Sequence, residues 1–392
     1  MAEGKGKLGF AGSGDAAVPA PVPVLLARGG IRIHFPAFLH PMNRRRFLRQ
    51  STAAAAAFPL AGCGGKAGSA ETLNVFLWAE YLPDDVVNDF SKEAGCRVQV
   101  DTYNSNEEMM AKAATGNCGY DIVCPSQYAV SDMARQRLLA ELDRAALRGL
   151  GNLDGRFTGL KSDPDGKFAV PYLGASTGIG YHRGSLPNPP RSWAGLFDAV
   201  QLEPLRGRLS MLDDAREAPA AALFALGLSP NATAEADIRR AGEQLKTQKP
   251  FVACYDSEAF EDKLASGSCS IVQGYAGDFV AVMEKDPQLD FFLPSEGAVF
   301  NMDCLCVLAQ SPRIPLALKF LDFVLRPDIA ARISSGTGYV SANAKAPDLL
   351  GDSLKNHPCF RIPAEDKLVM LDDPGPAVKD LYTGMWESVK QA

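Results

Sequence analysis

The stretch LDDARE holds three carboxylates, because Asp213 and Asp214 are adjacent and Glu217 follows Asp214 by three residues. The D-x-x-E spacing before an alanine-rich run is typical of a capping box, in which the two side chains satisfy backbone N–H groups at the start of a helix. Two carboxylates at the edge of a cleft could instead hold a cation. Both interpretations stay open at this point.

Other aromatic, hydroxyl and acidic residues stand beside turn-forming residues along the chain. They are Trp78, Tyr81, Ser126, Tyr128, Tyr275, Asp278, Asp303 and Tyr339. Taken singly, each has a structural explanation, since an aromatic residue after a strand is usually core or rim. They indicate a function only if the fold brings them together.

A catalytic interpretation rests on GASTG, residues 174–178, which matches the G-x-S-x-G nucleophile elbow with Ser176 as nucleophile. That motif requires a helix after the serine, whereas the following IGYH is extended in pattern. The motif also needs a histidine later in the chain, and only His182 and His357 follow Ser176. A secreted serine hydrolase is therefore the weaker alternative, and the principal expectation is that the protein is not an enzyme.

Metal and cofactor sites are not expected. The sequence has no C-x-x-C spacing, and His182 and His357 are the only histidines after the leader. Dinucleotide binding is not expected either, because no G-x-G-x-x-G opens a helix. Eight cysteines follow Cys63, and eight cysteines allow 105 pairings, so disulfide connectivity stays open.

The length of 392 residues suits two domains, and 46% hydrophobic with 22% charged residues indicates a mostly globular chain. The net charge of -6 is unevenly distributed, because residues 1–62 contain eight Lys/Arg and two Asp/Glu. The remaining chain is strongly acidic. This argues against binding nucleic acid, which requires basic residues to neutralise phosphates.

An export signal is predicted over residues 42–62. It has paired arginines at Arg44 and Arg45, an alanine-rich stretch too short to span a bilayer, and then LAGC. The order is similar to a twin-arginine signal ending in a lipobox, which makes Cys63 the lipidated residue. We expect residues 1–41 to be an untranslated or disordered extension and residues 63–71 to be a tether.

Strand and helix patterns alternate after the tether. Strands are predicted at 72–78, 97–103 and 120–126, with a helix ending at Gly95 and a second helix running from a Ser105–Glu108 capping box to Gly116. A third helix is predicted near 129–137. This order implies a largely parallel sheet covered by helices. Residues 168–182 are predicted as two linked strands, and a second α/β segment follows.

From Thr72 to Asn343 the chain resembles the periplasmic spermidine/putrescine-binding proteins of polyamine ABC transporters. Ten blocks match in order: LWAEYLP, TYNSNEEMMAK, YDIVCPSQYAVSDM, VPYLGASTGIGYH, SWAGLF, LSMLDDARE, GYAGDF, EGAVFNMDCL, LKFLDFVLRPDIA and TGYVSAN. The resemblance implies an α/β, two-lobed periplasmic binding protein fold. Each lobe is a mixed sheet flanked by helices, with a hinge between the lobes. The implied lobes are 72–177 with 302–347 and 178–301 with 348–392.

The resemblance also implies a ligand site between the lobes. Its residues are Trp78, Tyr81, Ser126, Tyr128, Asp214, Glu217, Tyr275, Asp278, Asp303 and Tyr339. Asp303 is the implied ammonium-binding carboxylate, and Asp213 is expected to be structural. The chain departs from the family pattern at Asn301 and Tyr275, where relatives often have larger aromatic residues.

The chemistry fits a polyamine, because ammonium groups need carboxylates and a methylene stem needs aromatic faces. The expected protein is a monomer, anchored by lipid in the periplasm, that delivers putrescine or spermidine to an inner-membrane permease. The sequence does not separate these two ligands. Alternatives are a polyamine sensor for a membrane signalling protein and a binder of another cation or small amine.

Overall fold

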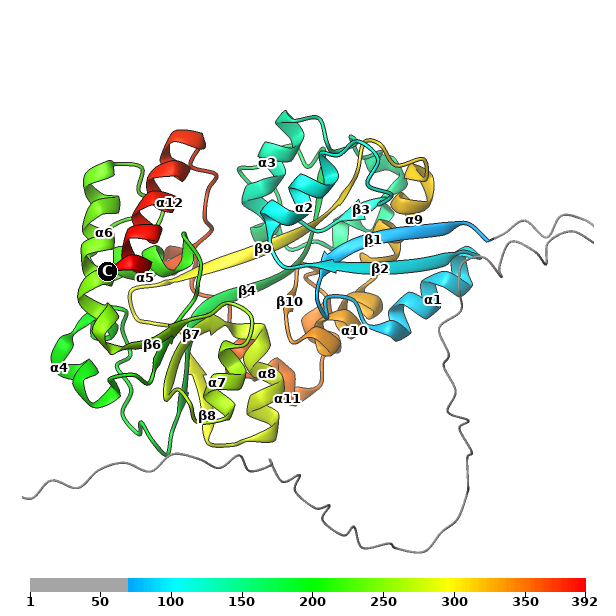
Figure 1. Ribbon diagram of the computed structural model, residues 1–392. Coiled ribbons are helices and arrows are strands. Elements are labelled where there is room, and N and C mark those ends of the chain that lie inside the picture. Colours follow the sequence, from blue (N-terminus) through cyan, green and yellow to red (C-terminus); the bar gives the residue numbers. More distant parts are fainter. Residues whose placement is uncertain (1–69) are drawn as a thin grey trace, which may run out of the picture. The chain divides into compact units, whose positions relative to one another are not determined.

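The computed structural model describes residues 70–392 (Figure 1). The predicted extension, the export signal, Cys63 and most of the tether therefore lie outside the described residues. Among residues 70–392, no helix is both long and apolar enough to cross a membrane. The eight cysteines of this part of the chain are all free thiols.

The first lobe is built on three parallel strands, as the alternating pattern predicts. They are β1 (Thr72–Trp78), β2 (Arg97–Tyr103) and β3 (Ile122–Val123). The connecting helices are α1 (Asp84–Ala94), α2 (Asn106–Ala113) and α3 (Gln127–Arg135). Two further helices, α9 (Ile314–Val324) and α10 (Pro327–Thr337), follow later in the chain.

Local capping explains where the first helices begin and end. Gly95 ends α1 with φ of 65°, a left-handed conformation that glycine adopts without a steric penalty. The Ser105 hydroxyl accepts a bond from the Glu108 backbone N–H at 3.1 Å and so caps α2. The helix ends at Ala113, however, rather than at the predicted Gly116.

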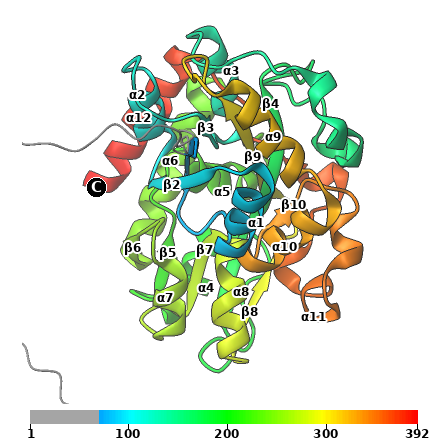
Figure 2. The same ribbon diagram turned by 90° about the vertical axis from the view of Figure 1, so that its right-hand side faces the viewer.

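Alternation along β1 distributes its side chains to the two faces of the sheet. Leu73, Val75 and Leu77 pack in one core with residues of α1, α9 and α10. Phe76 faces the other core, which is formed with α2 and α3. The sheet is therefore covered on both faces (Figure 2).

Two long strands, β4 (Ala169–His182) and β9 (Ala298–Val307), run from one lobe to the other (Figure 1). The prediction of two linked strands in 168–182 is wrong, because β4 is continuous. Up to Ser176 it pairs antiparallel with β9, and from Thr177 it pairs with a strand of the second lobe. Glycine permits this close pairing, since a Cβ on Gly178 would lie 2.4 Å from the ring of Phe291.

The second lobe contains four strands. They are β5 (Leu209–Met211), β6 (Val252–Tyr255), β7 (Ile271–Tyr275) and β8 (Leu289–Phe292). Its helices are α4 (Ala199–Leu202), α5 (Glu217–Ala225), α6 (Glu235–Gln248), α7 (Phe260–Ala265) and α8 (Ala276–Lys285). All strands connect in the order β2-β1-β3-β9-β4-β7-β5-β6, with β8 and β10 (Val340–Ser341) beside β4 and β11 (Leu368–Val369) beside β9.

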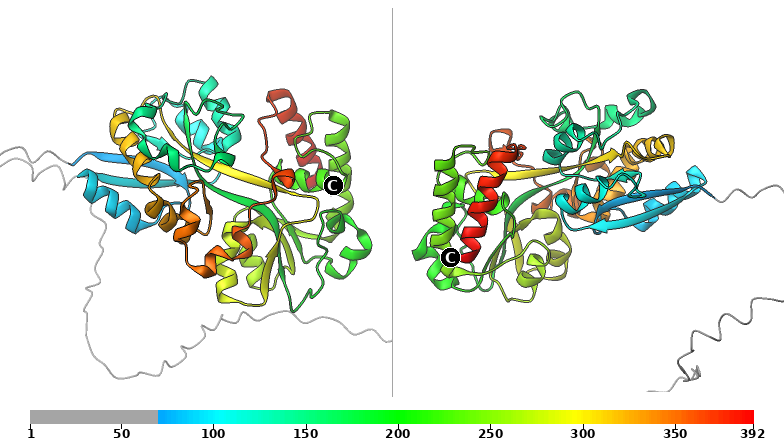
Figure 3. Two further views of the ribbon diagram at one scale, coloured as in Figure 1. Left: turned by 180° about the vertical axis from the view of Figure 1, so that it is seen from behind. Right: turned by 45° about the horizontal axis from the view of Figure 1, so that its top comes forward.

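The C-terminal segment makes a third connection between the lobes. After β10 and α11 (Asp352–Lys355), the chain forms β11 and ends in α12 (Pro376–Gln391), which packs on α6 (Figure 3). In between, the carbonyl of Leu371 accepts a bond from the α3 side chain of Gln127 at 3.1 Å. The carbonyl of Met370 accepts one from Asn231 of the second lobe at 2.9 Å.

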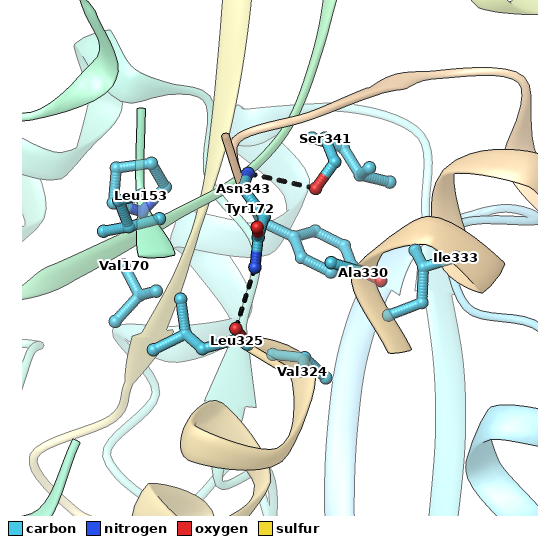
Figure 4. A pocket seen from close by; sticks show the side chains of 11 residues that line it. Leu153, Val170, Tyr172, Val324, Leu325, Ala330, Ile333, Ser341 and Asn343 are labelled. Carbon is cyan, nitrogen blue, oxygen red and sulfur yellow. Dashed lines mark hydrogen bonds between the residues drawn. The ribbon is translucent and has the colours of Figure 1, made fainter. Parts of the chain in front are cut away.

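A small cavity of about 10 Å³ lies beside the irregularity in β4 between Pro171 and Leu173 (Figure 4). Asn343 closes it by donating its side-chain amide to the Leu325 carbonyl at 2.8 Å. This space is at most enough to hold one water molecule. It therefore cannot be the site of an organic ligand.

Asp121 ties the first lobe together. It is fully buried, and its carboxylate accepts bonds from the Asn74 backbone at 2.8 Å, the Ser311 hydroxyl at 2.6 Å and the Arg313 guanidinium at 2.9 Å. We predict that Asp121→Ala lowers the free energy of unfolding by about 3 kcal/mol, because it leaves partly buried donors without an acceptor. Urea denaturation followed by circular dichroism measures this loss. Asp165→Ala is the control, since Asp165 is 73% exposed, and an equal effect of both changes would contradict the prediction.

Candidate functional site

A cavity of about 1130 Å³ lies between the two lobes. All ten residues that the sequence singled out line it: Trp78, Tyr81, Ser126, Tyr128, Asp214, Glu217, Tyr275, Asp278, Asp303 and Tyr339. They come from the ends of β1, β3 and β7 and the residues just after them, from the starts of α3, α5 and α8, from the middle of β9 and from the loop after α10. The fold thus brings together side chains that are far apart in the sequence.

Asp303 is the buried carboxyl group on the first-lobe side of the cavity. Its two oxygens accept bonds from the Tyr81 hydroxyl at 2.7 Å and the Ser126 hydroxyl at 2.7 Å. Burial raises the pKa of Asp303 to about 6, although both hydroxyl groups lower it. Both donors are neutral, so this carboxyl group can still accept a cation.

Asp214 and Glu217 stand at the start of α5 in the second lobe. Asp214 lies just before the N-cap residue Arg216, and its Oδ1 accepts bonds from the backbone N–H groups of Arg216 at 2.7 Å and Glu217 at 2.8 Å. The capping-box prediction is only half right. The Glu217 side chain does not reach back to Asp214, since its Oε1 accepts a bond from the Asn301 amide at 2.5 Å.

Glu217 is only 3% exposed, and its second oxygen, Oε2, has no hydrogen-bond partner. Burial and the neighbouring Asp214 raise the pKa of Glu217 to about 7. Burial also raises the pKa of Asp214. The nearby Arg216 guanidinium lowers the pKa of both groups but forms no ion pair with either, and Oε2 of Glu217 remains without a hydrogen bond in the described part of the chain.

Asp278 lies in the first turn of α8, and its Oδ1 accepts a bond from the Tyr339 hydroxyl at 2.8 Å. Burial raises the pKa of Asp278 to about 7, with smaller contributions in the same direction from Glu261 and Glu80. The Tyr339 hydroxyl acts in the opposite direction. A third acidic position thus faces the same cavity.

Aromatic rings form the walls between these carboxyl groups. Tyr339 packs edge-on against Tyr81 with ring centroids 5.0 Å apart, and Trp78 packs against Tyr103 at 4.6 Å. The Tyr128 hydroxyl accepts a bond from Asn106 at 2.8 Å. These faces suit an apolar stem or a cation near a ring.

The basic residues that line the cavity are engaged with other groups. Lys379 of α12 lies 3.4 Å from Glu107 of α2, and Arg135 of α3 lies 3.0 Å from Asp373. Arg216 donates to the Asp372 carbonyl at 3.2 Å. Lys390 lies 3.3 Å from Asp213. Within residues 70–392, no lysine, arginine or histidine forms an ion pair with Asp214, Glu217, Asp278 or Asp303.

Asp213 differs from Asp214 in its contacts. Its carboxylate accepts a bond from the Trp386 indole at 3.0 Å and so holds α12. It also lines the cavity. These contacts support the expected structural role.

Several lining residues lie outside the predicted set. Asn301 stands outside the predicted set as a departure from the family pattern, and the sequence does not predict the contributions of α12, which include Lys379 and Trp386. Helix α12 reaches the cavity only because it packs on α6, and no local motif indicates that packing. The sequence does contain a signal for Glu107 as a lining residue, because it is an acidic residue in the first turn of α2.

The structure contradicts the nucleophile-elbow interpretation of Ser176. The motif lies within the continuous strand β4, without a turn or a following helix. Ser176 is 1% exposed and donates to the Arg361 carbonyl at 3.3 Å. The two histidines act locally, since Nδ1 of His182 accepts from the Gly184 backbone and Nδ1 of His357 from the Cys359 backbone.

Comparison with known proteins identifies clear relatives. The family model of the bacterial extracellular solute-binding proteins matches residues 85–361. A spermidine/putrescine-binding periplasmic protein of Salmonella typhimurium is 33% identical over 77% of this chain and 86% of its own length. A putrescine-binding periplasmic protein of Escherichia coli is 31% identical over 83% of this chain and 93% of its own.

A solved structure has the same fold. The TpPotD lipoprotein of Treponema pallidum superposes with a TM-score of 0.75 and 26% sequence identity, covering 81% of this chain and 99% of that one. Two lobes joined by crossing strands are therefore the architecture of both chains.

The hydrogen bond from Tyr81 to Asp303 generates a prediction about the acidity of the cavity. Tyr81→Phe removes one of two donors that stabilise the ionised carboxylate, so the pKa of Asp303 should rise above about 6. Carboxyl ¹³C shifts followed through a pH titration measure it. Tyr181→Phe is the matched control, because Tyr181 donates at 2.7 Å to Asp290 in the second lobe. An unchanged or lower pKa of Asp303 in Tyr81→Phe would show that the hydroxyl does not act on this carboxyl group.

Proposed function

Since the chain belongs to the bacterial extracellular solute-binding protein family, we propose that it binds a polyamine between its lobes and delivers it to an ABC importer permease. One observation carries this proposal. Four carboxyl groups face one cavity, and within residues 70–392 none of them has a cationic side chain as ion-pair partner. A ligand with several ammonium groups would supply the missing positive charge.

The ligand contacts are proposed to be the ten predicted residues. Asp303 would bind one ammonium group, and Asp214 with Glu217 or Asp278 another. The rings of Trp78, Tyr81, Tyr128, Tyr275 and Tyr339 would cover the methylene stem. An amino-acid ligand is disfavoured, because its carboxylate would meet these acidic groups, while Arg135, Lys379 and Lys390 already have acidic partners.

Closure of the lobes would complete the site. The cavity of about 1130 Å³ exceeds the range of roughly 300–1,000 Å³ that is common for small-molecule sites. Bending of β4 and β9 would bring Asp214 and Glu217 toward Asp303. We propose that the permease recognises this closed form. The alternative role as a polyamine sensor has no observation in its favour.

The carboxylates allow a direct test of amine binding. We predict that putrescine, cadaverine or spermidine binds to the protein in isothermal titration calorimetry, whereas glutamate does not. Asp303→Asn should weaken binding by about tenfold or more, because a charge-assisted hydrogen bond contributes about 1.5–3 kcal/mol. Asp213→Asn is the control, since Asp213 holds α12. Absence of heat with every amine would refute the proposed function, and equal losses in both variants would mean that Asp303 is not the ammonium site.

We further propose that the chain is exported through a twin-arginine route and anchored in the periplasm as a monomeric lipoprotein. The support is the order of paired arginines, alanine stretch and LAGC at Cys63. Cells expressing the full chain and fed a radiolabelled fatty acid should label the wild type, and Cys63→Ala should abolish the label. Cys118→Ala serves as a control for general thiol acylation, because Cys118 is a partly exposed free thiol. Persistence of the label in Cys63→Ala would rule out this anchor.

A further inference from the structure

Asn301 makes a contact that the proposed ligand set does not explain. It lies on β9, two residues before Asp303, so both side chains point to the same face of the strand. Its amide donates to Oε1 of Glu217 at 2.5 Å, across 84 residues of sequence. Asn301 therefore joins a strand that crosses between the lobes to the N-terminal turn of α5.

The contact leaves the other oxygen of Glu217 without a hydrogen bond. Glu217 lines the cavity, and its Oε2 is buried and unpaired within residues 70–392, while the Thr177 hydroxyl, which is also buried and unpaired, lowers the pKa of this carboxyl group. A buried acceptor without a donor costs about 1–3 kcal/mol. Because Asn301 holds Oε1, the side chain cannot rotate to exchange its oxygens without breaking a hydrogen bond. An N–H donor from a ligand would satisfy Oε2.

The surroundings of Glu217 place its ionisation near neutral pH. Burial and Asp214 raise its pKa to about 7, while Asn301, Thr177 and Arg216 lower it. Tyr275 faces the same carboxyl group from the end of β7. In the free protein at neutral pH, Glu217 is therefore divided between its protonated and ionised forms.

We propose that Asn301 is a positioning residue that holds Glu217 ready to exchange its proton for the ammonium group of a ligand. The proposal rests on the proposed function. The step balances, because the ligand enters as R–NH₃⁺, the Glu217 carboxylic acid loses its proton to solvent, and the carboxylate pairs with the unchanged ammonium. The hydrogen bond from the Asn301 side-chain amide to Glu217 remains in place throughout and stabilises the carboxylate.

The sign of the pH dependence follows from this exchange. The ligand binds the ionised carboxylate, so affinity is full above pH 7 and falls as the pH drops through about 7. Asn301 lowers the pKa of Glu217, so its removal should shift this fall to higher pH. A residue with a purely structural role would change affinity without moving the profile.

Calorimetry with putrescine between pH 5.5 and 8.5, in two buffers of different ionisation enthalpy, measures both affinity and protons released. We predict that Asn301→Leu weakens binding at pH 7 by about ten- to a hundredfold and moves the affinity profile to higher pH. Asn301→Gln, which keeps an amide donor, should recover part of the loss. In a Glu217→Gln background, Asn301→Leu should have little further effect, since the group on which it acts is gone.

Asn152→Leu is the matched control, because it removes an amide that donates to the Leu325 carbonyl at 3.1 Å away from the cavity. It should leave the pH profile unchanged, and thermal unfolding checks that each variant is folded. An unchanged profile in Asn301→Leu, or an equal loss with and without Glu217, would overturn this proposal while amine binding stands. Absence of binding by the wild type would instead refute the proposed function.

Discussion

Burial of a carboxyl group without a cation is unfavourable, because the ionised form loses its hydration. Three carboxyl groups in the cavity between the lobes are buried in this way. Burial raises the pKa of Asp303 to about 6 and the pKa values of Glu217 and Asp278 to about 7. Each of the three carboxyl groups receives one or two bonds from neutral donors, which hold it in place without neutralising it. The free cavity is thus prepared for a cation that the described chain does not itself supply.

The rest of the architecture keeps this arrangement intact. Strands β4 and β9 cross from one lobe to the other, and β9 presents Asn301 and Asp303 to the cavity. Three of the basic residues that line the cavity have acidic partners of their own, as in the pair of Lys379 with Glu107, and Arg216 is bonded to the Asp372 carbonyl. If these cations were free, they could occupy the acidic positions and compete with a ligand.

The contact between Lys379 and Glu107 also joins the two lobes, because α12 packs in the second lobe and α2 in the first. Together with the segment around Leu371, it places a second set of polar contacts across the cavity. Exposed ion pairs of this kind contribute little stability, typically about 1 kcal/mol or less. They can therefore break and re-form when the lobes move, while the hydrophobic core of each lobe stays intact.

The sequence alone determined the local elements and the chemical character of the site. Strands at 72–78 and 97–103 match β1 and β2, and Gly95 and Ser105 act as the predicted helix caps. These features depend on neighbours within a few residues. Short motifs and the family resemblance also indicate the ten site residues, and all of them line one cavity.

The partners of those residues depend on tertiary contacts. The continuous course of β4 depends on pairing with β9 and β7, and not on its own glycine-rich pattern. Glu217 bonds to Asn301 rather than closing a capping box, and Tyr81 bonds to Asp303 across 222 residues. Such contacts form between segments that folding brings together, so their geometry and the resulting pKa values are set by packing that no local pattern encodes.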